Sequence, residues 1–165
     1  MRSAKPKLGG VSDPYLIRLA TPADAADIGR LLHDFNREFE DYTPGAEAIA
    51  ERAKALLERG EITVVLGGEG PDGFAVLRLR PGLTGEGLEA YLQEMYVAPD
   101  RRGQGLGRAV LERAIEVARE AGARSMELAT AETDRAARAL YESCGFSNLE
   151  GTPGGPPMLF YEREL

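Results

Sequence analysis

The chain has 165 residues, of which 43% are hydrophobic and 28% are charged, and its formal net charge is −7. This length and composition are typical of one globular domain with its own core. The negative charge argues against nucleic acid as the main partner, because phosphate backbones attract basic surfaces, and a cationic substrate fits better. The chain contains no run of about 18 apolar residues, so no membrane span is predicted. The single cysteine, Cys144, excludes an internal disulfide and fits a reducing, cytoplasmic compartment.

The amino-terminal residues are not predicted to belong to the folded domain. A basic opening from Met1 to Lys7 is followed by Gly9 and Gly10, where a signal peptide would have its apolar segment. We therefore expect a flexible tail at residues 1–13 and a single domain at residues 14–165.

Hydrophobic periodicity and turn residues then predict the elements in chain order. The first half is expected to form a strand at 15–19, helices at 21–39 and 49–57, and an antiparallel pair of strands at 62–66 and 74–79. The second half is expected to form a strand at 91–97, a helix at 106–121, a strand at 125–129, a helix at 134–143, and strands at 146–149 and 158–164. The strands at 91–97 and 125–129 flank a long helix, so they should run parallel with a right-handed crossover.

The most informative stretch is Arg102-Gly103-Gln104-Gly105-Leu106-Gly107, between a strand and an amphipathic helix. Glycines let backbone N–H groups close on an anion, and a helix N-terminus adds unpaired donors and its positive dipole end. A P-loop is excluded because no Gly-Lys pair occurs in the chain. A dinucleotide-binding G-x-G-x-x-G/A pattern also fails, since the third glycine position falls on Arg108 or on Val110.

The same loop matches R/Q-x-x-G-x-G/A, the pyrophosphate loop of the GNAT superfamily of N-acetyltransferases. The chain resembles this family also in Tyr96-Val97-Ala98-Pro99 before the loop, and in the block from Ala139 to Phe146. The resemblance implies an α/β (α+β) fold, with a mixed, mostly antiparallel sheet of about seven strands flanked by about four helices. It also implies a splayed parallel strand pair that binds acyl-CoA, and direct transfer of an acetyl group from acetyl-CoA to a primary amine of a small molecule or peptide.

Residue by residue, the resemblance implies cofactor contacts at Met95, Tyr96, Val97, Arg102, Gly103, Gln104, Gly105, Leu106, Gly107, Arg108, Asp134 and Tyr141. The contacts of Met95, Tyr96 and Val97 would come from the main chain, which would hold the pantetheine arm and polarise the thioester carbonyl. The side chains of Arg102 and Arg108 are candidates for phosphate contacts, with solvated arginines as the alternative. Asp134 stands where many relatives carry Asn and lacks the amide donors, so we expect it mainly to cap the following helix.

Tyr141 is the predicted proton donor, because a phenol can donate to sulfur as the CoA thiolate leaves. The alternative for Tyr141 is a core aromatic residue. Glu94 is the first candidate for the general base. Other carboxylates that could take this role, or remain solvated, are Glu132, Glu38, Glu40 and Asp41.

Several alternatives remain open from the sequence. Catalysis could have been lost, which would leave an acyl-CoA-binding sensor or partner module, or the acceptor could be a hydroxyl or a thiol. Cys144 is expected to be a packed thiol and His33 a surface residue. One Cys and one His cannot build a metal centre of the usual kind, so no metal is expected. A homodimer is possible, and the acceptor could be an amino-terminal peptide, a polyamine, an aminoglycoside or a small metabolite.

Overall fold

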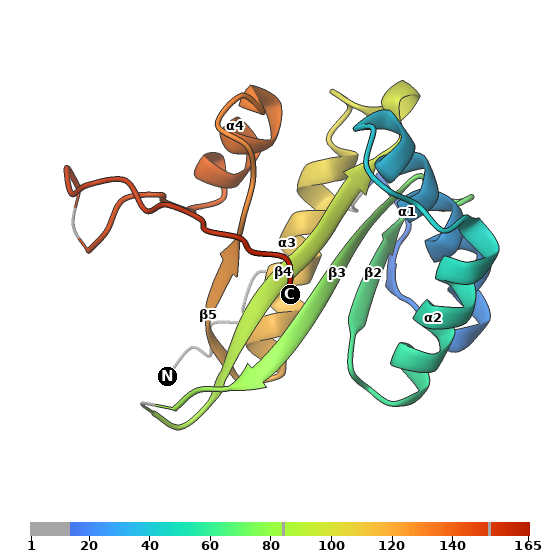
Figure 1. Ribbon diagram of the computed structural model, residues 1–165, viewed down its shortest axis with the longest axis horizontal. Coiled ribbons are helices and arrows are strands. Elements are labelled where there is room, and N and C mark those ends of the chain that lie inside the picture. Colours follow the sequence, from blue (N-terminus) through green and yellow to red (C-terminus); the bar gives the residue numbers. More distant parts are fainter. Residues whose placement is uncertain (1–13, 84, 152) are drawn as a thin grey trace, which may run out of the picture.

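The computed structural model describes residues 14–83, 85–151 and 153–165, so the tail expected at residues 1–13 lies outside the described residues. Within them, five strands form one sheet in the order β1-β2-β3-β4-β5 (Figure 1). The strands are β1 (Ile17–Leu19), β2 (Thr63–Gly67), β3 (Gly73–Pro81), β4 (Leu88–Val97) and β5 (Ala123–Leu128). The α-helices are α1 (Ala25–Glu38), α2 (Ala46–Glu58), α3 (Leu106–Glu120) and α4 (Arg135–Ser143). Short 3-10 turns at Pro22–Asp24 and Pro99–Arg101 precede α1 and the loop before α3.

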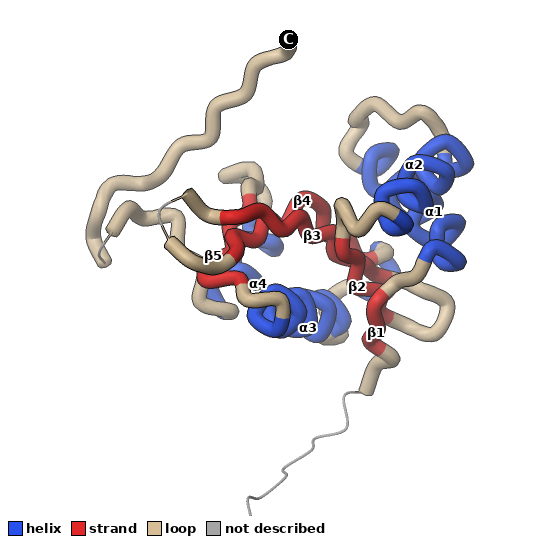
Figure 2. The backbone as a smooth tube through the Cα atoms, turned by 90° about the horizontal axis from the view of Figure 1, so that it is seen from below, coloured by secondary structure: helices blue, strands red, loops and turns tan. Residues whose placement is uncertain are grey.

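Helices cover both faces of the sheet, with α1 and α2 on one side and α3 and α4 on the other (Figure 2). Each face has its own buried cluster because strand side chains alternate between faces. Phe74 and Leu66 belong to the cluster under α1 and α2. On the other face α3 inserts a fully buried stripe that includes Leu106, Val110 and Leu111. Burial of each such side chain contributes roughly 1.5–3 kcal/mol relative to exposure, which fixes α3 against the sheet.

The predicted antiparallel pair of β2 and β3 and the predicted parallel pair of β4 and β5 are confirmed. β3 also pairs with β4 antiparallel, which joins the two pairs into one sheet. The register of β3 and β4 shifts between Val76 and Leu77, so that Gln93 is an extra residue in β4. Such a bulge bends and twists the strand at the point where β4 leaves its parallel partner.

Two of the seven strand predictions, at residues 146–149 and 158–164, are wrong. Residues 146–149 contribute only an isolated bridge, from Leu149 to Pro157, and residues 158–164 form no strand. Met158, Phe160 and Tyr161 are exposed, and the last residues run away from the sheet (Figure 2). Their apolar and aromatic composition favours a strand locally, but a strand also requires a neighbour with which to pair. The described chain therefore has five strands rather than about seven.

The entry into α1 is tied to β1 by a charged pair. Arg18 donates to both carboxylate oxygens of Asp24, at 2.9 and 2.6 Å, and the backbone N–H of Thr21 donates to the same carboxylate at 2.7 Å. These donors hold the pKa of Asp24 well below its usual value. The predicted helix start at Thr21 is thus a 3-10 turn that leads directly into α1.

Candidate active site

The glycine-rich loop links the end of β4 to the N-terminus of α3, as the sequence indicates. Gly103 has φ +71° and Gly105 has φ +96°, conformations that residues with a Cβ rarely adopt. The N–H of Ala109 makes the first bond of the α3 ladder, to the carbonyl of Gly105 at 3.1 Å. The amides of Leu106, Gly107 and Arg108 precede that ladder and lie at the positive end of the helix dipole. The loop thus carries main-chain donors of the kind that can bind an anion.

Two further contacts hold the loop in place from outside. The hydroxyl of Tyr15 donates to the carbonyl of Gln104. The side chain of Gln104 donates to the carbonyl of Asp100 at 2.8 Å. Gln104 therefore acts on the loop conformation through both its main chain and its side chain.

The side chains of the two loop arginines are bound to protein groups. Arg102 forms a bidentate pair with Glu38, with both N···O distances at 2.7 Å, and its Nε donates to the carbonyl of Val97 at 2.8 Å. Arg108 donates to Ser143 Oγ at 2.8 Å and lies 3.6 Å from Cys144 Sγ. Neither side chain is simply solvated, and Arg108 connects the start of α3 to the end of α4.

The parallel strands separate next to this loop. The β4–β5 pairing covers Leu88 to Leu92 on β4 and ends at Leu128 on β5. The remainder of β4, from Gln93 to Val97, still pairs with β3 but extends beyond the last pair with β5. This geometry leaves the β5 side of the end of β4 available to an extended ligand, as the splayed pair expected from the resemblance would require.

Glu94 lies on this part of β4, directly opposite Val76. Val76 and Tyr96 belong to the cluster under α1 and α2, so the Glu94 side chain is on that face of the sheet. Burial raises the pKa of Glu94, a hydrogen bond from Gln93 opposes the shift, and the negative charge of Asp41 adds to it. A carboxylate with a raised pKa is a stronger base at neutral pH.

Tyr141 lies on α4 and packs on the other face, against the cluster under α3, as do Met95 and Val97. Its ring is 6.0 Å from that of Phe146 in an edge-on arrangement. Burial, with a smaller contribution from the charge of Asp134, raises the pKa of Tyr141 to about 12. The hydroxyl is consequently a neutral donor across the physiological pH range. The side chains of Glu94 and Tyr141 thus lie on opposite faces of the sheet.

Asp134 caps α4, because its Oδ1 accepts a hydrogen bond from the N–H of Ala137 at 3.0 Å. This confirms the predicted cap. The carboxylate also lies near enough to Tyr141 to act on its pKa, which the sequence did not indicate.

The other candidates differ in their surroundings. Glu40 and Glu132 are exposed, and His33 Nδ1 lies 2.9 Å from Thr43 Oγ1 on the partly buried side of α1. Cys144 is half-buried and packs against the α3-side core, as expected for a packed thiol. Among the described residues, no cluster of His, Cys, Asp and Glu side chains could hold a metal ion, and no helix there is long and apolar enough to cross a membrane.

Sequence reasoning missed the contact between Glu38 and Arg102 and the proximity of Asp41 to Glu94. Glu38 and Arg102 are 64 positions apart, and no periodicity relates them. The only available signal was that Glu38 and Asp41 were already candidate carboxylates, at and just after the end of the first helix.

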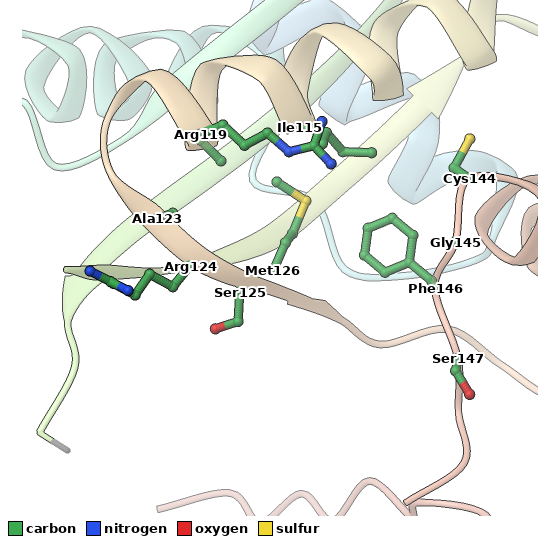
Figure 3. Close-up of a pocket in the computed structure, with 11 residues that line it drawn as sticks. Ile115, Arg119, Ala123, Arg124, Ser125, Met126, Cys144, Gly145, Phe146 and Ser147 are labelled. Atoms are coloured by element: carbon green, nitrogen blue, oxygen red, sulfur yellow. The ribbon is translucent and has the colours of Figure 1, made fainter. Parts of the chain in front are cut away.

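A cavity of about 320 Å³ lies elsewhere, between the end of α3, β5 and the segment after α4 (Figure 3). Met126 and Phe146 point toward each other across it, whereas Cys144 points away. None of the predicted site residues lines this cavity.

Comparison with known proteins agrees with this geometry. The model of the acetyltransferase (GNAT) family matches residues 28–146. The aminoglycoside N(6')-acetyltransferase type 1 of Stenotrophomonas maltophilia is 33% identical over 139 residues, which are 81% of this chain and 87% of that protein. The thialysine N-epsilon-acetyltransferase of Bos taurus is 28% identical over 84% of this chain and 88% of its own length.

A crystal structure from Arthrobacter sp. FB24, assigned as an acetyltransferase, superposes with a TM-score of 0.83 at 42% identity and covers all of both chains. The family match spans well over half of the chain and includes β4, the glycine loop and α4. The chain therefore belongs to the GNAT family and is an N-acetyltransferase.

Proposed function

We propose that this enzyme transfers an acetyl group from acetyl-CoA directly to a primary amine of a small molecule or peptide. The observation that carries the proposal is the position of the glycine loop at the N-terminus of α3, immediately beside the separation of β4 from β5. The first feature suits a diphosphate and the second suits an extended pantetheine arm. A single bound molecule of acetyl-CoA would need both.

In this proposal the amides from Gly103 to Arg108 hold the diphosphate of the cofactor. The main chain of Met95 and Tyr96 binds the pantetheine arm, and an N–H there polarises the thioester carbonyl. The carbonyl of Val97 already accepts one hydrogen bond, from Arg102, so a ligand would share that carbonyl with the arginine.

The two titratable side chains have complementary roles. Glu94 accepts the proton of the attacking ammonium group, directly or through water, because its raised pKa suits a general base. The neutral amine nitrogen then bonds to the acetyl carbon, the C–S bond breaks, and the second proton that the nitrogen loses passes to the departing CoA thiolate through the Tyr141 hydroxyl or through water. Tyr141 donates a hydrogen bond to the sulfur as negative charge develops there, because its own pKa keeps it protonated.

We further propose a cationic acceptor. Glu94 and Asp41 place two carboxylates near each other on the α1 face, and the chain carries a net charge of −7. Two of the similar proteins are named for thialysine and aminoglycosides as acceptors. A cytoplasmic location and a homodimer stay predictions from the sequence.

The test combines binding and turnover. Calorimetry with CoA measures affinity, and release of free thiol from acetyl-CoA measures transfer to spermidine, thialysine, an aminoglycoside and a peptide with a free amino terminus. We expect binding and thiol release with at least one amine, and mass spectrometry should place the acetyl group on nitrogen. Binding without turnover would favour an acyl-CoA sensor, and Gly105→Glu, which puts bulk and negative charge into the cradle, should abolish binding.

A further inference from the structure

Three segments that are distant in the sequence meet around the side chain of Arg102. Its two terminal nitrogens pair with the carboxylate of Glu38 at the end of α1, both at 2.7 Å. Its Nε donates to the carbonyl of Val97, the last residue of β4. Its guanidinium carbon lies 5.4 Å from the centre of the Tyr96 ring, within the range of a cation–π contact.

These contacts occupy every nitrogen of the guanidinium. Fork-to-fork pairing with a carboxylate is among the strongest geometries available to an arginine, and it fixes the direction of the Arg102 side chain. The pair persists at neutral pH because Arg102 keeps the pKa of Glu38 below its usual value. The side chain is therefore directed toward the end of α1.

The same contacts connect to the part of the molecule that carries the proposed base. Tyr96 is only 6% exposed, and its ring packs 5.5 Å from that of Phe35 on α1. Glu94 is two residues before Tyr96 on β4 and shares its face of the sheet. The Arg102 side chain thus joins the end of β4, close in sequence to Glu94, to the end of α1.

We propose that Arg102 is a positioning residue for the acceptor side of the site, acting through Glu38 and Tyr96, and that its side chain does not bind the cofactor diphosphate. The inference rests on the proposed function. It assigns the diphosphate to the loop amides alone. It also predicts that Glu38, on a different element, matters to the reaction as much as Arg102 does.

The test compares Arg102→Lys, Arg102→Gln and Glu38→Gln with the double variant Glu38→Gln/Arg102→Gln. Lysine keeps the charge beside the loop but cannot form the bidentate pair. Arg101→Gln serves as the matched control, because it removes an equal charge one residue earlier, where the side chain instead lies 3.5 Å from Asp72. The dissociation constant of CoA is measured by calorimetry. The kinetic constants are measured for spermidine, or for whichever amine of the panel is acetylated fastest.

We expect each single variant at positions 38 and 102 to lower kcat/KM for the amine about tenfold, because small displacements of a reacting group are costly. The kcat/KM of the double variant should be no lower than that of the less active single variant, since each single substitution already removes the contact between Glu38 and Arg102. The dissociation constant of CoA should stay within about twofold of wild type in Arg102→Lys, Glu38→Gln and Arg101→Gln, as expected for distant or charge-conserving changes.

Two results would overturn the inference without touching the proposed function. One is a CoA affinity that falls tenfold or more in Arg102→Gln but is preserved in Arg102→Lys and Arg101→Gln, which would make Arg102 a charged phosphate ligand. The other is an amine kcat/KM that remains at the wild-type level in Glu38→Gln. If wild-type protein neither binds CoA nor acetylates any amine of the panel, the proposed function itself fails and this inference with it.

Discussion

Replacing Gly105 by alanine tests whether the loop needs its left-handed turn. The residue has φ +96° and ψ −7°, and a Cβ built there meets only Tyr15 Cε2, at 3.9 Å. The substitution therefore causes no clash, and its cost is confined to the backbone. An L-residue in a left-handed conformation costs about 1–2 kcal/mol. Because the turn also aims the loop amides, relaxing it should weaken the binding of CoA.

Gly107 provides the matched comparison, two residues further on. It lies within the first turn of α3, where alanine is about 0.5–1 kcal/mol more favourable than glycine. A Cβ there would lie 3.5 Å from Val97 Cγ2 and 3.6 Å from Leu140 Cδ2, which is ordinary van der Waals contact. Gly107→Ala should accordingly be stabilising and should retain CoA binding.

The two variants should differ by about 1.5–3 kcal/mol in the free energy of unfolding, or roughly 3–12 °C in Tm for a domain of this size. Thermal unfolding followed by circular dichroism, without ligand, measures this difference. Calorimetry with CoA then measures binding. If Gly105→Ala melts at or above the wild-type temperature and binds CoA equally well, the left-handed turn is not required and the account of the cradle is refuted.

The remaining predictions concern single side chains. Tyr141→Phe should lower kcat by about 10- to 1000-fold with little change in CoA affinity, and an unchanged kcat would show that Tyr141 is not the proton donor. Because the pKa of Tyr141 is raised to about 12, deprotonation of this group should cause no loss of wild-type rate below about pH 10. Glu94→Gln should lower kcat/KM and remove the fall of kcat/KM at acidic pH that the wild-type enzyme shows. Its Tm at pH 7 should equal or exceed that of wild type, because burial disfavours the charged form of Glu94, and a clear fall in Tm would contradict this. Asp24→Asn should cost about 1–2 kcal/mol at pH 7, measured by urea unfolding, since it breaks a partly buried charged pair. The pKa of Asp24 is lowered in the folded state, so its stabilisation is present above about pH 4 and declines below it; a difference from wild type that is as large at pH 3 as at pH 7 would contradict the assignment.

Local patterns in the sequence predicted the parts of the site that depend on local chemistry. The helix at 106–121 was predicted from its apolar stripe and is observed as Leu106–Glu120. The loop before it was predicted from its glycines, and the cap of the helix at 134–143 from Asp134. Each of these rests on groups within a few residues of one another, so composition and spacing are sufficient to specify them.

Contacts between distant segments could not be predicted in this way. The pair between Glu38 and Arg102 and the influence of Asp41 on Glu94 join different elements, and each arises only when α1 packs on the sheet. The strands predicted at 146–149 and 158–164 failed for the related reason that strand formation depends on a partner and not on composition alone.

The sequence by itself determined the family, the glycine turn that leads into α3 and the order of elements from β1 to α4, because glycine conformations and hydrophobic periods are properties of short segments. Only the tertiary structure decided where the β4–β5 pairing ends, which direction the Arg102 side chain takes, and that Glu94 and Tyr141 lie on opposite faces of the sheet. These features depend on which side chains and main-chain groups meet across the fold, and that is settled by packing and desolvation between residues far apart in the chain.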